Sequence, residues 1–303
     1  MNTESKSFVK VFFAGCLWGT IGLFVKLMEN AGSSAAYTSF VRLLFGFLLL
    51  VVLTLIFDGA KAFRIGKRTL ISCILLGIVS QGLYNILYSR SISLNGMAVA
   101  SVLLYTAPVF TGIMSALFFK EKLTATKCAA LLVNVLGCVL TATGGKISGA
   151  GIALTGVLFG VGAGLTYAMI AIFGRIAMQE QSSPFAVATY NLLFGCIFVA
   201  IVSHPWTTVS APLDAHILLI GLLYALIPTA AAYVLYFGGL SNIKQTSKVT
   251  VVASVELIVA TGIGAFVFKE AVAVGNILGI ALVLLSIFLF NIQKPLNKMS
   301  RTA

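Results

Sequence analysis

Ten long runs of apolar residues, separated by short gaps, constrain this chain more than any other feature of its sequence. A helix needs roughly 20 mainly apolar residues to cross the hydrocarbon of a bilayer, which is about 30 Å thick. We therefore expect ten transmembrane helices with short connections, in an all-α integral membrane fold. The runs cover residues 11–25, 35–57, 69–89, 91–119, 128–145, 147–175, 181–203, 217–243, 249–268 and 271–293.

The composition excludes a soluble protein. Of the 303 residues, 59% are hydrophobic and 9% are charged, whereas a soluble domain carries about 25% charged residues. A globular cytosolic enzyme and a secreted domain are both excluded, because neither could build its water-solvated surface from this sequence. Lys6 and Lys10 precede the first apolar run as in a secretory signal, but no A-x-A-like cleavage site follows, so we interpret the run as an uncleaved first helix.

The cysteines and histidines do not predict a reactive or metal-binding site. The five cysteines lie inside apolar runs without close pairs, and we interpret them as small core residues. They are Cys16, Cys73, Cys128, Cys138 and Cys196. His204 and His216 belong to one loop region and are expected at the surface. We therefore expect no catalytic residues, no metal and no cofactor.

Basic residues predict the orientation of the chain. The net charge is +12, which in a soluble protein would suggest nucleic acid, but here the basic residues occupy the gaps between spans, where they determine topology. With the N-terminus inside, fifteen of the 20 Lys and Arg residues are cytoplasmic. Four (Lys26, Arg90, Lys146 and Lys269) fall on the other side, and Arg42 lies within a span. We expect both termini to be cytoplasmic, a multi-pass location in a bacterial-type cytoplasmic (inner) membrane, and no nucleic-acid partner.

The two halves of the sequence resemble each other at a shift of 149 residues. This shift places Lys26 on Arg175 and Trp18 on Tyr167. It also places the tripeptide F-K-E at 119–121 on the same tripeptide at 268–270. Apolar sequences match by chance, but two charged matches at one common shift indicate a real repeat.

The number of spans per half predicts how the repeats are related. Five is odd, so the second half enters the membrane from the opposite face, and the halves form two inverted repeats. We expect the first repeat at residues 1–146 and the second at residues 147–303, which includes a basic cytoplasmic tail. Two packings exchanged by the symmetry axis would open the protein alternately to each side of the membrane.

Several segments resemble the EamA-type branch of the drug/metabolite transporter superfamily over about residues 8–292. They are L-W-G-T-I-G-L-F-V-K at 17–26, S-F-V-R-L-L-F-G at 39–46, L-L-Y-T-A-P-V-F at 103–110, F-F-K-E-K-L at 118–123, A-A-Y-V-L-Y-F-G-G-L at 231–240 and S-V-E-L-I-V-A at 254–260. Leu257 stands where the family usually carries proline. The resemblance implies a basket of helices 1–4 and 6–9 around a central cavity, with helices 5 and 10 outside. Family members move amino acids, amines, nucleotide-linked metabolites or drugs, many of them outward.

Two charged residues lie deep within spans, where a charge is costly and a functional role is the default hypothesis. Glu256 stands nearly halfway along the ninth span, and desolvation favours the neutral form of a carboxyl group. It either binds a proton or a cationic group during transport, or ties its helix to a neighbouring backbone. Arg42, in the second span, either meets a substrate carboxylate, pairs with Glu256, or is a structural residue that snorkels or bonds to backbone. Its repeat counterpart is the neutral Asn191.

A polar stripe marks the third span. Gln81, Tyr84, Asn85 and Tyr88 follow a helical spacing that places them on one face. The repeat aligns Gln81, Asn85 and Tyr88 with Thr229, Tyr233 and Tyr236 of the eighth span. Lipid penalises such a face, so we expect both stripes to line a cavity; hydrogen bonding between helices is the alternative.

Aromatic rings, prolines and glycines complete the candidate residues. Trp18, Tyr105 and Tyr167 are expected to offer ring faces to an amine, whereas Tyr190 and Tyr224 fit a cavity or packing equally. Pro108 and Pro228 lie within spans and are candidate hinges whose freed carbonyls could line the cavity. Gly160, Gly162 and Gly164 are expected to allow close helix packing, because a dinucleotide loop would need a preceding strand.

These features predict a secondary transporter of a small polar or amphipathic metabolite such as an amino acid or amine. Export by alternating access is the expected mode, with protons as the candidate coupling ion. The expected partners are the small-molecule substrate and the lipid bilayer, and the protein is a monomer or homodimer. A passive channel or lipid scramblase on the same fold is the alternative. A polytopic membrane enzyme is a weaker one, because clustered acids and histidines are missing from the sequence.

Overall fold

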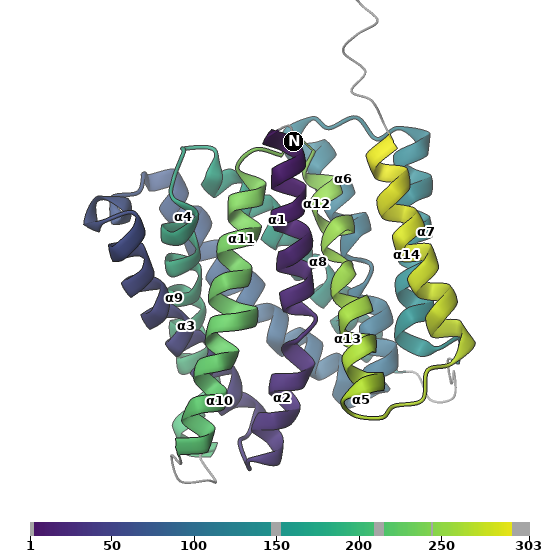
Figure 1. Cartoon of the computed structure of the whole chain (residues 1–303), viewed down its shortest axis with the longest axis horizontal. Helices are drawn as coiled ribbons and strands as arrows, with labels where there is room; N and C mark the ends of the chain where they lie inside the picture. The colour runs from purple at the N-terminus through teal and green to yellow at the C-terminus, as the bar shows by residue number, and fades with distance from the viewer. Residues whose placement is uncertain (1–2, 147–152, 209–214, 244, 293–303) are drawn as a thin grey trace, which may run out of the picture.

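The computed structural model describes residues 3–146, 153–208, 215–243 and 245–292. Within these ranges all regular structure is helical, and the helices stand side by side in one bundle (Figure 1). Nine helical stretches are long and apolar enough to cross a membrane, and a shorter apolar helix covers Val274–Leu289. The protein is therefore a multi-pass membrane protein.

The α-helices are α1 (Thr3–Trp18), α2 (Ile21–Asn30), α3 (Ala35–Phe57), α4 (Lys67–Leu75), α5 (Tyr84–Leu104), α6 (Ala107–Phe119), α7 (Ala125–Thr143), α8 (Leu154–Met178), α9 (Pro184–Ser203), α10 (Ala215–Ala225), α11 (Ala232–Leu240), α12 (Thr246–Ala253), α13 (Val255–Phe266) and α14 (Val274–Ile292). Short 3₁₀ turns cover Ala60–Phe63 and Pro205–Thr208, and π-helical segments cover Leu76–Leu83 and Leu226–Ala231. α1 begins and α14 ends at the same end of the bundle (Figure 1).

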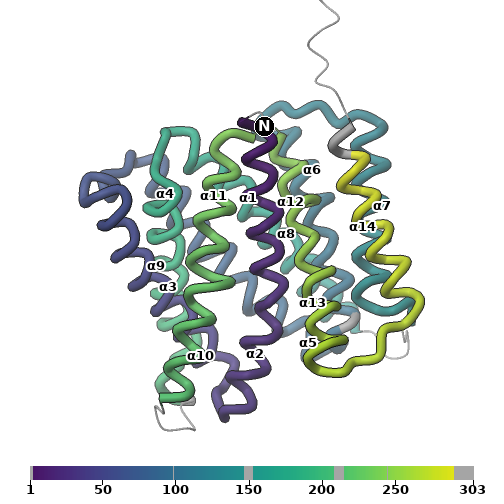
Figure 2. Tube along the Cα trace, in the orientation of Figure 1, coloured from purple at the N-terminus to yellow at the C-terminus, as the bar shows by residue number. Residues whose placement is uncertain are grey.

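Several expected spans differ from the observed helices. The first span is not one helix but two, α1 and α2, which follow one another down the bundle (Figure 2). The expected gap at Arg90 is wrong: the helix continues past it and turns at Gly96, whose φ of 79° favours glycine. An arginine near the end of a helix can reach the interface without ending that helix. The expected boundary between the repeats, at 146 and 147, adjoins residues 147–152, which lie outside the described ranges, as does the tail from residue 293.

Helices α3 and α9 begin with the same cap. The Ser34 side chain accepts a hydrogen bond from the Tyr37 N–H at 3.2 Å. The Ser183 side chain accepts from the N–H groups of Phe185 and Ala186. A capping serine satisfies one of the donors left free at a helix start. The two serines are 149 residues apart, as the sequence repeat requires.

Five spans are interrupted near their middle. Breaks separate α1 from α2, α5 from α6 and α12 from α13, and π-helical segments separate α4 from α5 and α10 from α11. The break after α12 lies at Ser254, so it forms although Leu257 replaces the usual proline.

At four of these interruptions a hydroxyl side chain donates a hydrogen bond to a backbone carbonyl of the preceding turn. Thr20 donates to Leu17 O at 2.7 Å and Thr106 donates to Leu103 O at 2.6 Å. Thr229 donates to Tyr224 O at 3.0 Å, and Ser254 donates to Thr250 O at 3.1 Å. The carbonyls of Leu17, Leu103 and Thr250 also accept a backbone N–H, so the hydroxyl is a second donor there. Ser and Thr side chains commonly support irregular backbone in a membrane in this way.

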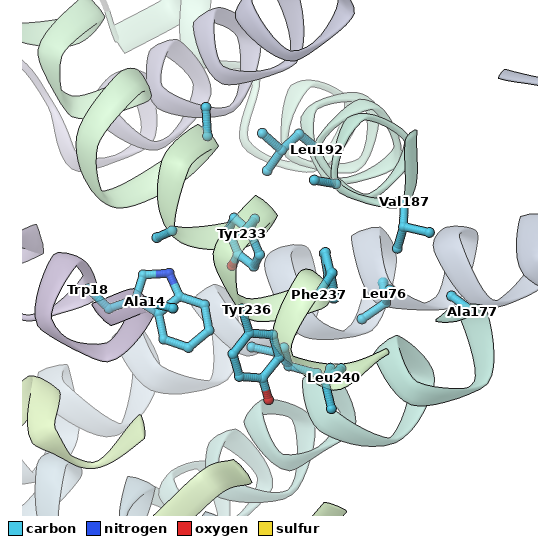
Figure 3. Close-up of a cluster of buried hydrophobic side chains, with 14 of the residues drawn as sticks. Ala14, Trp18, Leu76, Ala177, Val187, Leu192, Tyr233, Tyr236, Phe237 and Leu240 are labelled. Atoms are coloured by element: carbon cyan, nitrogen blue, oxygen red, sulfur yellow. The ribbon is translucent and has the colours of Figure 1, made fainter. Parts of the chain in front are cut away.

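The main core joins α1, α8, α9 and α11. Trp18, Leu192, Tyr233, Tyr236 and Phe237 pack together in its centre (Figure 3). The interpretation of cysteines as core residues is wrong for Cys128, which is exposed on α7, and Cys16 is only partly buried; Cys73, Cys138 and Cys196 are buried. A one-dimensional apolar pattern does not separate the lipid-facing side of a helix from its packed side.

Glycines bring helices into close contact. On α8, a Cβ at Gly160 would lie 2.5 Å from Leu103 and one at Gly164 would lie 2.5 Å from Thr106, so these glycines serve packing against the α5–α6 region. Helices α7 and α14 lie side by side at one edge of the bundle (Figure 1). There, a Cβ at Gly279 would lie 2.3 Å from the Thr141 nitrogen.

We predict that Gly279→Ala destabilises the protein. The added methyl group meets backbone, which cannot move aside cheaply, and overpacking of this kind costs about 1–3 kcal/mol. Gly262→Ala is the matched control, because no heavy atom lies within 4 Å of a Cβ built there. Thermal unfolding of the purified protein in detergent measures both; equal melting temperatures would contradict the prediction.

Candidate substrate-binding site

The carboxyl group of Glu256 lies in the first turn of α13, directly after the break at Ser254. The Tyr167 hydroxyl of α8 donates to it, at 3.2 Å from Oε1 and 3.0 Å from Oε2. The position at a helix N-terminus also favours a negative charge there. In the part of the chain that the structure describes, the ion pairs are Lys26–Glu270 and Arg175–Glu121, so Glu256 is in neither.

Tyrosine rings lie next to the carboxyl group of Glu256. The Tyr84 ring stacks on Tyr88, with centroids 5.7 Å apart, and meets Tyr167 at 5.5 Å. Tyr105, between α5 and α6, packs near Leu257. Glu256 and the four tyrosines are each partly exposed. The arrangement presents a carboxylate beside several ring faces, which is the chemistry that attracts an ammonium group.

The stripe of the third span is continuous despite the π-helical segment. The Asn85 side chain donates to the backbone carbonyl of Gln81, and the Tyr88 hydroxyl lies 3.0 Å from the Ser101 hydroxyl. Gln81 itself is buried, whereas Asn85 and Tyr88 are partly exposed. The sequence did not predict Ser101 as a hydrogen-bond partner of Tyr88. Ser101 lies beyond the turn at Gly96, so no helical spacing relates the two residues.

Arg42 pairs with an amide and not with Glu256. Its Nη2 donates to Gln81 Oε1 at 3.3 Å, and its guanidinium lies 5.5 Å from the centre of the Tyr224 ring. The Gln81 amide donates in turn to the Tyr233 hydroxyl. The alternative that Arg42 forms an ion pair with Glu256 is therefore wrong for this structure. The network Arg42–Gln81–Tyr233 joins α3, the first π-helical segment and α11.

The stripe of the eighth span is buried. Thr229, Tyr233 and Tyr236 have relative exposures of 5% or less. The Trp18 ring lies 5.4 Å from Tyr233 and 4.9 Å from Tyr236, and all three rings meet in the core (Figure 3). Asn191 is also fully buried, and neither its amide nitrogen nor its carbonyl oxygen has a hydrogen-bond partner among the described residues.

The two prolines lie at irregular backbone. Pro108 does not interrupt a helix interior but sits in the first turn of α6, where its missing N–H costs little. Pro228 lies in the second π-helical segment. The Tyr224 carbonyl, four residues earlier, accepts from the Thr229 hydroxyl and is thus satisfied within the helix. The Tyr224 ring stacks on Phe24, and the Tyr190 hydroxyl donates to Phe63 O, so both tyrosines have packing partners.

The geometry defines a class of protein: a helical membrane protein with a polar and aromatic cluster at interrupted spans. A family model described as "EamA-like transporter family" matches residues 6–143 and again residues 154–292. The chain belongs to this family.

Relatives and solved structures agree with that class. An "Uncharacterized transporter" of Archaeoglobus fulgidus is 26% identical over 280 residues, covering 92% of this chain and 94% of the relative. The "Uncharacterized transporter YwfM" of Bacillus subtilis is 24% identical over 295 residues, covering 97% and 96%. One crystal structure superposes with a TM-score of 0.76 at 17% identity, covering 94% of this chain and 96% of that one; this likeness shows the fold.

We predict that the Gln81 amide couples energetically to Tyr233. Gln81→Leu leaves Arg42 and the Tyr233 hydroxyl without their partner, and an unsatisfied buried group costs about 1–3 kcal/mol. Tyr233→Phe removes the hydroxyl, and the double variant should cost less than the sum of the single ones. Unfolding of all four proteins in detergent measures this coupling. Strict additivity would contradict the hydrogen bond.

Proposed function

We propose that the protein is a secondary transporter that exports a small polar or amphipathic metabolite such as an amino acid or amine. The observation that carries the proposal is the Glu256 carboxyl group, which lies at a helix break, bonds to the Tyr167 hydroxyl and sits among accessible tyrosine rings. An unpaired carboxylate beside ring faces suits an ammonium group. The outward direction rests on the resemblance to a family with many exporters.

A second polar centre suits the other end of an amino acid. Arg42 is partly exposed, and its Nε has no hydrogen-bond partner among the described residues. Guanidinium groups bind carboxylates well. The Tyr84 ring lies 5.5 Å from the ring of Tyr167, whose hydroxyl bonds to Glu256. An amino acid zwitterion would place its ammonium at Glu256 and its carboxylate at Arg42.

Alternating access follows from the repeat. The bounds of α7 and α14 differ by 149 residues at both ends, and both repeats carry a π-helical segment in their third span. Five spans in each half make the repeats inverted, with both termini in the cytoplasm according to the distribution of basic residues. The two halves then exchange conformations to expose the site to either side.

We predict that Glu256→Gln abolishes substrate binding and coupled transport. The amide keeps the size of the side chain but removes the charge that attracts an ammonium group. A thermal-shift screen of amino acids and amines on the purified protein finds ligands, because a ligand that binds only the folded form raises its melting temperature. Counterflow of the hits in proteoliposomes then measures transport. Tyr167→Phe should weaken binding, and Glu29→Gln, an exposed carboxyl at the end of α2, is the control.

The same experiment separates the alternatives. A channel or scramblase would give flux that does not saturate and cannot be driven uphill, and that result would overturn the proposal. A wild-type protein that concentrates its substrate against a gradient supports it. Proton-dependent flux that stays normal in Glu256→Gln would end the role of Glu256 in proton coupling.

A further inference from the structure

Two ion pairs join the two halves of the chain, and the sequence repeat relates them. Arg175 Nη1 lies 2.5 Å from Glu121 Oε1, and Lys26 Nζ lies 2.7 Å from Glu270 Oε1. The shift of 149 residues places Lys26 on Arg175 and Glu121 on Glu270. Each pair thus takes its cation from one half and its anion from the other, with the roles of the halves exchanged.

The two pairs lie at opposite ends of the bundle. The end of α6 and the start of α12 flank Glu121, and both lie at the end where α1 begins (Figure 1). Helix α2, which carries Lys26, and the end of α13, which precedes Glu270, lie at the other end. We call the two groups the Glu121 latch (Glu121 and Arg175) and the Glu270 latch (Lys26 and Glu270).

Each latch repeats the same contacts. The Arg175 guanidinium lies 4.2 Å from the centre of the Phe119 ring, and the Lys26 ammonium lies 4.0 Å from the centre of the Phe268 ring. A cation over a ring face is attracted to it. The tripeptide F-K-E therefore supplies an aromatic face and a carboxylate to the opposite half, at each end.

The backbone of the tripeptide is also repeated. Lys120 has a φ of 52° and Lys269 a φ of 55°, a left-handed conformation that a lysine rarely adopts. The N–H of the next residue then donates to a carbonyl six residues earlier, at 3.3 Å for Glu121 and 3.0 Å for Glu270. Such agreement in an unfavourable conformation indicates that both sites serve the same purpose.

The latches differ in how tightly they are engaged. In the Glu121 latch the side chains of Arg175 and Glu121 are 19% and 6% exposed, whereas in the Glu270 latch Lys26 and Glu270 are 44% and 57% exposed. An exposed ion pair contributes little, while removing one partner from a buried pair is strongly destabilising. The Glu121–Arg175 contact is thus held tightly, and the Lys26–Glu270 contact is held weakly.

The Glu121 carboxylate is also docked on the start of α12. It accepts from the Thr246 N–H at 2.6 Å, from the Ser247 N–H at 3.4 Å and from the Ser247 hydroxyl at 2.9 Å. Arg175 donates to the Thr246 hydroxyl. The carboxylate thereby serves as the anion that a helix N-terminus attracts.

The first half contains an equivalent helix start, and Glu270 is not docked on it in this conformation. The repeat places Thr246 on Met97, directly after the turn at Gly96, where the second part of α5 begins. Met97, the first residue after the turn, is 68% exposed and thus lies at the surface of the bundle. Among the described contacts, the hydrogen bond of the Glu270 carboxylate comes from Lys26.

We propose that the two latches close alternately. In the conformation described here the Glu121 latch is closed. In the opposite conformation Glu121 leaves α12, and Glu270 docks with Lys26 on the backbone N–H groups that begin the helix at Met97. This proposal rests on the proposed alternating access, and it names the contacts that each state makes and the other lacks.

Distances between spin labels at each end test the latches. In a background with the five cysteines replaced by serine, one labelled pair at Lys122 and Asn242 reports on the Glu121 end, and one at Glu29 and Val272 reports on the other. These side chains are exposed. We expect Glu121→Gln to widen the Lys122–Asn242 distance and, at the same time, to narrow the Glu29–Val272 distance. The population ratio of the two conformations should change about tenfold or more.

Glu270→Gln is the matched control, because it makes the same chemical change in the exposed latch. Alone it should leave both distances unchanged, and added to Glu121→Gln it should reverse part of the shift. If Glu121→Gln changes neither distance, or widens one end without narrowing the other, the proposal is overturned. If the wild-type protein shows saturable counterflow but Glu121→Gln leaves both distances unchanged, the latches alone are rejected. If the wild-type protein shows no counterflow, the transporter proposal itself is rejected.

Discussion

The need to satisfy every backbone polar group inside the membrane governs this structure. Five spans are interrupted, and lipid cannot bond to backbone groups that an interruption leaves without a helical partner. Thr20, Thr106, Thr229 and Ser254 donate side-chain hydrogen bonds to backbone carbonyls at four of the interruptions. These hydrogen bonds allow irregular backbone to lie within the bundle. Continuous helices would present only side chains to the interior of the bundle. The candidate site depends on this arrangement.

The position of Glu256 follows from one such break. Because α12 ends at Ala253, the carboxyl group falls in the first turn of a new helix, and the N-terminus of a helix favours an anion. The break between α1 and α2 approaches the same point: a Cβ at Gly19 would lie 2.6 Å from the Glu256 carbonyl oxygen. A glycine is therefore required there, and the hydroxyl of Tyr167 completes the surroundings of the carboxyl group. The site is a product of helix termini as much as of side chains.

The sequence predicted the membrane class and the family, and both are confirmed. Apolar length decides whether a segment crosses a bilayer, so these features are visible in one dimension. The break at Ser254 is not visible in the sequence, because it depends on tertiary partners. The Ser254 hydroxyl bonds to Asn134 of α7. The partner of Arg42 was equally hidden, since Gln81 and Glu256 both offered oxygens and only packing selects between them. The roles of the predicted site residues in transport stay predictions.

The two halves agree at the ion pairs and differ at Glu256. The shift of 149 residues preserves the F-K-E tripeptide and its cation in both copies, but it places Glu256 on Ala107 and Tyr167 on Trp18. Trp18 packs in the core against Tyr233 and Tyr236, and Ala107 is buried and carries no charge. Under the proposed alternating access, two equivalent end contacts suit a motion that runs in both directions. A single carboxyl group suits the binding of one substrate at a time, as proposed for Glu256. The halves therefore differ where we propose that the substrate binds, and they agree where we propose that the latches act.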